Sequence, residues 1–108
     1  MRPGEVRLSP RALAAEAELQ LKQRKKLAWW ITRLKGDPFA GDQIPKRLIP
    51  SKLAARHGLP EITNLWRTEL PLAWRMLYTV QSSPATLTVV LVLEVLSHRD
   101  YDRLLGYG

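Results

Sequence analysis

The C-terminal half of the chain contains three segments whose hydrophobic patterns are those of β-strands. Leu87–Leu96 is apolar at odd and even positions alike and carries one charge, Glu94, which is typical of a central strand covered on both faces. Ala73–Val80 alternates, with Trp, Met, Tyr and Val on one side and Arg, Leu and Thr on the other. Pro71 separates this segment from Ile62–Leu70. The pattern therefore predicts three consecutive strands in an antiparallel meander.

The N-terminal half has a helical pattern, which follows a short strand predicted at Glu5–Arg7. Ser9 is a suitable N-cap, and Pro10 follows at the first helical position. From there to Lys35 no further Gly or Pro occurs, and good helix formers dominate. Polar residues interrupt the apolar stripe near residues 20–24, so we expect two helices folded into a hairpin rather than one long helix. The stripe consists of Leu13, Ala17, Leu27, Ile31 and Leu34.

Two further short helices are predicted around the strands. Pro50–His57 is long enough for two helical turns, and Gly58 is a suitable C-terminal cap. After the last strand, Ser97 or Asp100 can cap a final helical turn. Because the helices precede the strands, we expect a single α+β domain over residues 1–108, a helical hairpin packed on one face of a small twisted antiparallel sheet. The other face of that sheet must then be covered or used.

Composition limits the function classes. The formal net charge of +7 favours a polyanionic partner such as RNA, DNA, an acidic protein or an anionic membrane. The absence of cysteine excludes a disulfide scaffold and suits the reducing cytoplasm. No apolar leader is visible, and the longest apolar run is far shorter than the ~20 residues that span a bilayer, so we expect a cytoplasmic protein without a membrane partner. With two distant histidines and no glycine-rich phosphate loop, we expect neither a metal nor a cofactor.

Arg67 and Arg75 are the most specific candidates for chemistry. If the hairpin turns about Pro71, the two arginines are equidistant from the turn and share one face of the sheet. Two neighbouring guanidinium groups repel each other unless an anion lies between them, and arginine binds phosphate through a planar fork. Trp66 and Trp74 precede them and would anchor the opposite face. The alternative is that both arginines merely keep exposed strands soluble.

A second candidate group follows the last strand, in the segment Ser97–Tyr101. His98 titrates near neutrality and can transfer protons at the open rim of the sheet, although a hydrogen-bonded surface histidine is the alternative. Tyr101, three residues later, would lie on the same side of a helical turn, or else pack its ring against the sheet edge. His57 suggests no catalytic role, because a cation in the last turn of a short helix suits the helix dipole.

Basic residues also gather in two other segments. The first group is Lys22, Arg24, Lys25 and Lys26. We favour a solvated helix face for it, with contact to phosphates or to an acidic partner as the alternative. The second group is Lys46, Arg47, Lys52 and Arg56, which could form a basic groove with Arg67.

Three stretches together resemble a known family: IPKRLIP, ITNLWRTELPLAWRMLYTV and VLEVLSHRDYDRLLGY. Their pattern is similar to that of the RelE/ParE toxin superfamily of bacterial and archaeal toxin–antitoxin systems, and most similar to the RelE-like, ribosome-dependent mRNA interferases. The resemblance implies two helices on a small twisted antiparallel sheet whose concave basic face receives RNA. It implies attack of a ribose 2′-hydroxyl on the adjacent phosphate of mRNA in the ribosomal A site, which leaves a 2′,3′-cyclic phosphate.

The resemblance also implies roles for individual residues. Arg75 matches the strand arginine that stabilises phosphate charge, and Arg67 falls near a basic position on the preceding strand. His98 and Tyr101 would supply the base and the acid, in an order that stays open, and Glu69 is a further candidate for the base. RNA-binding side chains would be Lys46, Arg47, Lys52, Arg56 and Arg99. The implied partners are a cognate antitoxin, the ribosome and mRNA.

Two alternatives belong to other function classes. A ParE-type toxin inhibits DNA gyrase by binding it, but that branch typically lacks the His and Tyr found in Ser97–Tyr101. A degenerate member of the superfamily would keep the basic surface as a binding module without catalysis.

Overall fold

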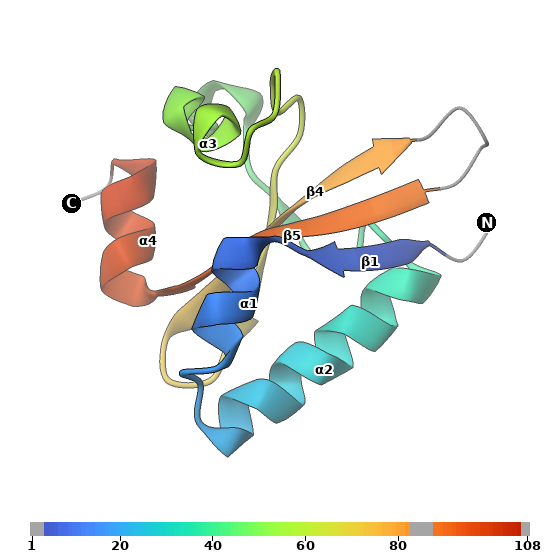
Figure 1. Cartoon of the computed structure of the whole chain (residues 1–108), viewed down its shortest axis with the longest axis vertical. Coiled ribbons are helices and arrows are strands. Elements are labelled where there is room, and N and C mark those ends of the chain that lie inside the picture. Colours follow the sequence, from blue (N-terminus) through green and yellow to red (C-terminus); the bar gives the residue numbers. More distant parts are fainter. Residues whose placement is uncertain (1–3, 83–87, 107–108) are drawn as a thin grey trace.

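The computed structural model describes residues 4–82 and 88–106, which form a five-stranded mixed sheet with helices on both sides (Figure 1). The strands lie in the order β1-β5-β4-β3-β2. Their bounds are Glu5–Leu8 (β1), Asp42–Gln43 (β2), Trp66–Leu70 (β3), Trp74–Ser82 (β4) and Thr88–Ser97 (β5). The helices are Pro10–Glu16 (α1), Leu21–Gly36 (α2), Ser51–Arg56 (α3) and His98–Leu105 (α4), with a 3-10 turn, η1, at Lys46–Leu48. None of these helices combines the length and apolarity that crossing a bilayer requires.

The predicted meander is confirmed, but the sheet is not wholly antiparallel. β3, β4 and β5 pair antiparallel, whereas β1 runs parallel to β5, with Glu5 opposite Val89. No tight turn joins β1 to its neighbour, so their connection does not force an antiparallel direction. The sequence also gave no sign of β2, which has only two residues. Leu87, at the start of the predicted last strand, lies outside the described residues.

The helical hairpin is present, and its break lies at residues 17–20, slightly before the expected position. The polar interruption of the apolar stripe is a cap: the backbone N–H of Gln20 donates to the side chain of Gln23 at 2.9 Å. Gln23 is itself buried and donates to the carbonyl of Pro71 at 3.2 Å. This amide therefore ties the start of α2 to the β3–β4 turn.

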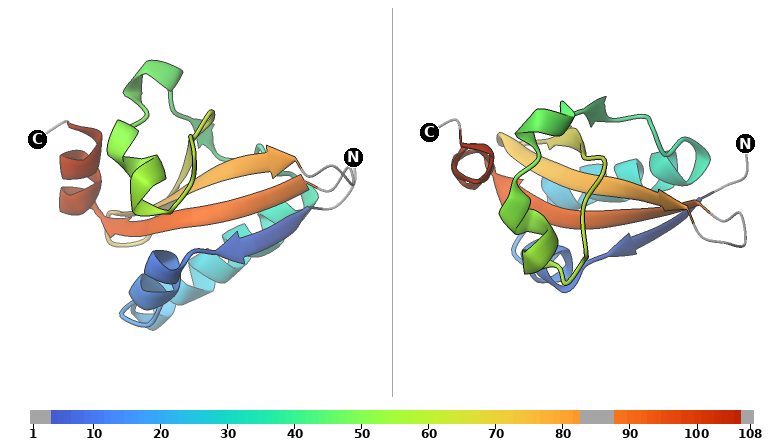
Figure 2. Two further views of the ribbon diagram at one scale, coloured as in Figure 1. Left: turned by 45° about the horizontal axis from the view of Figure 1, so that its top comes forward. Right: turned by 90° about the horizontal axis from the view of Figure 1, so that it is seen from above.

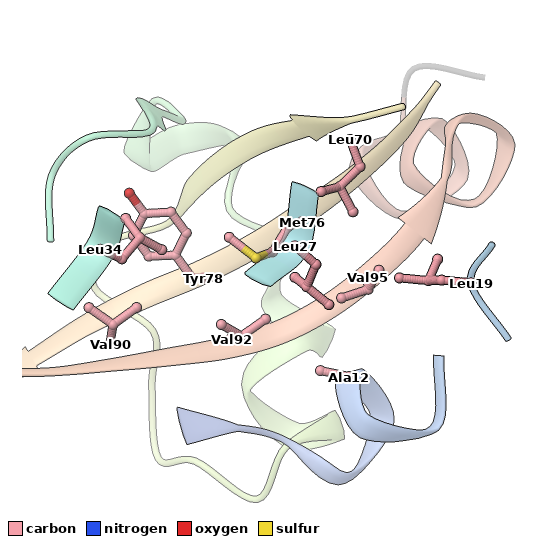
Figure 3. Close-up of a cluster of buried hydrophobic side chains, with 10 residues drawn as sticks. All are labelled: Ala12, Leu19, Leu27, Leu34, Leu70, Met76, Tyr78, Val90, Val92 and Val95. Atoms are coloured by element: carbon pink, nitrogen blue, oxygen red, sulfur yellow. The ribbon is translucent and has the colours of Figure 1, made fainter. Parts of the chain in front are cut away.

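One hydrophobic core lies between the sheet and the helices α1 and α2 (Figure 3). Leu27 and Leu34 of the predicted stripe are fully buried in it, but Leu13 is 53% exposed and Ala12 is buried in its place. The expectation for Leu13 was wrong because α1 is a short separate helix with its own inward face. The buried residues are Ala12, Leu19, Leu27, Leu34, Leu70, Met76, Tyr78, Val90, Val92 and Val95.

A second core covers the other face of the sheet, so the helices are not confined to one face as predicted. Figure 2 shows α3 on the side of the sheet opposite α1 and α2, with α4 at the end where β5 finishes. Leu77 and Leu93 are fully buried on this side. The cluster contains Ile44, Leu53, Leu65, Leu77, Leu93, Leu96, Tyr101, Leu104 and Leu105.

The β3–β4 turn sets which residues oppose each other. Leu72 and Ala73 both have positive φ, 65° and 61°, and the register is centred on Leu72. Arg75 therefore lies opposite Glu69, and Arg67 lies opposite Leu77. The expected symmetry of the two arginines about Pro71 is wrong by one residue, because the turn is built on the left-handed pair that follows the proline.

Candidate functional site

Arg67 and Arg75 converge on the ring of Tyr101, on the α3 and α4 side of the sheet. The guanidinium carbons lie 5.9 Å (Arg67) and 5.7 Å (Arg75) from the ring centroid. Nη1 of Arg67 also donates a hydrogen bond to the Tyr101 hydroxyl at 3.1 Å. A turn about Pro71 predicted that the two arginines share a face. The register is centred one residue later but still places both on one face. Three side chains from β3, β4 and α4 thus form one group, the Arg67–Arg75–Tyr101 cluster.

The elements that carry these side chains are anchored on their far sides. Trp66 and Trp74 point the other way and pack against the first core, as their alternation with the arginines predicted. Tyr101 is 2% exposed because its side chain packs from α4 into the second core. α4 begins at the predicted cap: the Ser97 side chain accepts from the backbone N–H of Asp100 at 3.3 Å.

Electrostatics differ between the two arginines. The hydrogen bond to Tyr101 is the main reason that the pKa of Arg67 lies above its ordinary value, and burial acts against it. Arg75 approaches Glu69 at 3.8 Å, but Glu69 is 68% exposed, so water screens that pair. The Nε of Arg75 is buried and has no hydrogen-bond partner among the described residues. The cluster therefore holds two positive charges, with the Glu69 carboxylate near both arginines and the Asp42 carboxylate near Arg67.

His98 begins α4 but stands apart from the cluster. Its side chain is 58% exposed, and Nε2 lies 3.0 Å from a carboxylate oxygen of Asp102. Within the described part of the chain no contact joins it to Arg67 or Arg75. The three-residue spacing predicted that His98 and Tyr101 would lie on the same side of a helical turn. His98 is exposed to solvent, however, whereas Tyr101 is buried.

The predicted RNA-binding residues are all exposed and lie on three elements. Lys46 and Arg47 are in η1, Lys52 and Arg56 in α3, and Arg99 in the first turn of α4. Within residues 4–82 and 88–106, Arg56 alone among these five forms an ion pair, in which its Nη1 lies 3.7 Å from a carboxylate oxygen of Glu94. In the other basic run, Lys22, Arg24 and Lys25 are exposed, as the solvated-face interpretation predicted, and Lys26 is partly buried.

Comparison with known proteins identifies the architecture. No family model and no curated protein sequence matches the chain. A solved structure does match: a mutant of the E. coli toxin RelE in the free state, with a TM-score of 0.60, 16% identity and 97% of each chain covered. The fold is RelE-like. The α+β architecture expected from the sequence is thereby confirmed. Two details differ from the expectation: the sheet is mixed rather than antiparallel, and helices lie on both of its faces.

Sequence reasoning missed a buried ionic group within this RelE-like fold, the Glu94 cluster. Glu94 is 1% exposed on β5. Its carboxylate accepts from Nε of Arg11 at 3.1 and 3.2 Å, and one oxygen lies 2.5 Å from Nε2 of His57. Nη1 of Arg56 lies 3.7 Å away. The signal was present, because a single charge inside a covered strand needs a partner.

The interpretation of His57 as a cation at the end of a helix was incomplete. Its side chain is only 4% exposed and faces the Glu94 carboxylate. The partner lies 37 residues further along the chain, so local sequence could not reveal it. In residues 4–82 and 88–106 of this RelE-like fold, no group of three or more His, Cys, Asp and Glu side chains could hold a metal ion.

Proposed function

We propose that this chain is the toxin of a toxin–antitoxin pair and cleaves mRNA in the A site of the ribosome. The convergence of Arg67 and Arg75 on Tyr101 carries the proposal, because two fixed guanidinium groups on one face of a sheet form a site for a phosphate group. Two further observations support it: the likeness to a protein described as the toxin RelE, and the net charge of +7. The protein would act in the cytoplasm.

The proposed reaction is an internal transfer at one phosphate. The ribose 2′-oxygen forms a bond to phosphorus and loses its proton to a base, while the bond to the 5′-oxygen of the next nucleotide breaks and that oxygen gains a proton. The products are a 2′,3′-cyclic phosphate and a 5′-hydroxyl. Negative charge grows on the phosphoryl oxygens in the transition state, where Arg75 and Arg67 would stabilise it.

The exposure of each remaining side chain indicates whether it could transfer protons or position the arginines. His98 is exposed and lies at the start of α4, so it is the better candidate for proton transfer. Tyr101 is almost fully buried and contacts both arginines, so its main role would be to hold the guanidinium groups in position. Glu69, opposite Arg75, is the further candidate for the base. Lys46, Arg47, Lys52, Arg56 and Arg99 would contact the RNA backbone.

A cognate antitoxin would cover part of α2. Lys26 places its Nζ 4.1 Å from the centroid of the Trp29 ring, and Trp29 is 50% exposed. Leu21 and Leu72, 68% and 56% exposed, add apolar surface. A partner segment that is both acidic and apolar would complement this surface, and complementary charge would speed its docking.

The test is to map cleavage of mRNA by the purified protein with and without programmed ribosomes. We expect the mRNA to be cut only when ribosomes are present. Cleavage by Arg75→Ala should be at least about 100-fold slower, because the guanidinium group that would stabilise the phosphoryl charge is lost. His98→Ala should also slow cleavage. Lys25→Ala, an exposed residue of α2, is the control and should cleave like the wild type. Intact mRNA with the folded wild-type protein would contradict the proposal, and a DNA supercoiling assay on the same preparation would test the gyrase alternative.

A further inference from the structure

Four basic side chains from three helices line a pocket of about 260 Å³ beside α4, which we call the α4-side pocket. α1 supplies Arg11, α3 supplies Lys52 and Arg56, and α4 supplies Arg103. These residues are distant in the sequence and meet only because α1 and α3 both lie beside the end of β5. The carboxylate that lines the pocket with them is Asp100, 3.9 Å from Arg103.

The Glu94 cluster fixes two of the four cations in place. Arg11 is held through its Nε, and Arg56 lies 3.7 Å from the same carboxylate. Because His57 also faces Glu94, that carboxylate is shared among three partners and only partly offsets the two arginines. Held guanidinium groups lose less freedom on binding an anion than free surface side chains do. Two of the four cations are therefore already positioned by the protein before any anion binds.

The pocket lies on a different side of α4 from the Arg67–Arg75–Tyr101 cluster. Residues 101 and 103 of a helix point about 200° apart around its axis, so Tyr101 and Arg103 face nearly opposite directions. Tyr101 contacts the two strand arginines, whereas Arg103 lines the pocket. One phosphate cannot occupy both positions.

We propose that the α4-side pocket binds a backbone phosphate of RNA, distinct from the phosphate at which the chain is cut. This inference rests on the proposed function for its RNA substrate. A peptide partner is disfavoured because the apolar residues in the lining, Leu96 and Leu104, are themselves buried and offer little apolar surface. The phosphodiester could belong to the mRNA or to ribosomal RNA, which share this chemistry.

The experiment removes two charges from the pocket without touching Glu94. The double variant Lys52→Gln/Arg103→Gln is compared with Lys22→Gln/Lys25→Gln, which loses the same charge on the exposed side of α2. Binding is measured by fluorescence anisotropy over a range of salt, first to 2′-O-methyl RNA, which cannot be cut, and then to empty small ribosomal subunits. Circular dichroism verifies that both double variants are folded.

We expect the pocket variant to bind roughly fivefold or more weakly, with a salt slope shallower by about 0.7 for each lost phosphate contact on a single strand. The α2 variant should change less than about twofold. A loss in the RNA arm assigns the phosphate to mRNA, and a loss confined to the ribosome arm assigns it to ribosomal RNA; either supports the pocket. Equal losses in the two variants, or no loss in either arm, would overturn it.

Two further arms separate this inference from the proposed function. Arg75→Ala should lose cleavage, and its salt slope for 2′-O-methyl RNA should fall by no more than the one phosphate contact that Arg75 makes, since the α4-side pocket is intact. If the pocket variant binds both RNA ligands normally but no longer binds a polyglutamate peptide, the pocket serves an acidic protein and the inference is overturned. Neither of these binding results depends on whether the protein cuts mRNA.

Discussion

Tyr78 shows how a single buried group holds the edge of the sheet in place. Its ring is fully buried in the first core, and its hydroxyl accepts a hydrogen bond from the backbone N–H of Gly41 at 3.0 Å. Gly41 has to be glycine, because a Cβ there would lie 2.7 Å from that hydroxyl and 2.8 Å from the carbonyl oxygen of Arg67. The hydrogen bond fixes the segment before β2 against a side chain of β4, where it also lies close to the backbone of Arg67 in β3.

Burial raises the pKa of Tyr78 to about 12, from an ordinary value of 10.0. Because the pKa is higher in the folded state, this contribution to stability is complete below about pH 10 and is lost as the pH rises towards 12. The free energy of unfolding should fall by up to roughly 3 kcal/mol over that window, since a pKa difference of one is equivalent to about 1.4 kcal/mol. Urea unfolding at several pH values measures it, with Tyr78→Phe as the control. An equal decline in the phenylalanine variant would contradict the assignment.

Single residues were predictable from sequence where the strand period alone decides their direction. The alternation of Trp66, Arg67, Trp74 and Arg75 was sufficient to place arginines and tryptophans on opposite faces. The pairing of Arg75 with Glu69 was not predictable, because it depends on the conformation of the turn. The burial of His57 was not predictable either, because its carboxylate partner comes from another element.

At the scale of elements, the β3–β4 hairpin depends on a strained turn. Leu72 and Ala73 both adopt left-handed backbone angles that side chains with a Cβ disfavour. Ala73→Gly should relieve part of this strain and stabilise the protein by up to about 1 kcal/mol. Ala28→Gly, in the exposed interior of α2, should destabilise by about 1 kcal/mol. Thermal unfolding of both variants measures the contrast, and a lower melting temperature for Ala73→Gly would show that the turn is not strained.

The sequence predicted the long elements and failed at the ends of the strands. Ile62–Leu70 was expected to be one strand, but β3 begins only at Trp66. Before it, the side chain of Asn64 accepts from the N–H of Val80 at 2.8 Å and donates to its carbonyl at 2.9 Å. A side-chain amide thus takes the place of backbone pairing, which no pattern of hydrophobic residues can indicate.

At the scale of the whole molecule, Glu94 connects α1, α3 and β5. Glu94→Gln should cost about 2 kcal/mol, because a neutral amide would weaken the hydrogen bonds that this buried carboxylate makes with Arg11 and His57. Glu18→Gln, on the exposed surface near α1, should change stability by less than about 0.5 kcal/mol. Urea unfolding compares the two variants. A similar small effect for both would mean that the buried carboxylate does not hold these elements together.

The overall architecture was largely predictable, because the hydrophobic segments and their order define an α+β chain. Its second helical layer was less evident: α3 and the turns around it are short, and each carries few buried side chains. The candidate site was predictable only in part. The arginines and Tyr101 meet because α4 folds back over β3 and β4, a long-range arrangement that the spacing of residues does not encode.

The parallel contact between β1 and β5 has a consequence for synthesis of the chain. The hydroxyl of Ser9 donates to the carbonyl of Leu93, 84 residues later, and β1 pairs with residues 89–92. A nascent chain emerges N-terminus first, so its opening strand must wait without its neighbour until almost all of the polypeptide has been made. Only then can α4 follow and bring Tyr101 to the arginines. The Arg67–Arg75–Tyr101 cluster is thus among the last parts of the structure to assemble during synthesis.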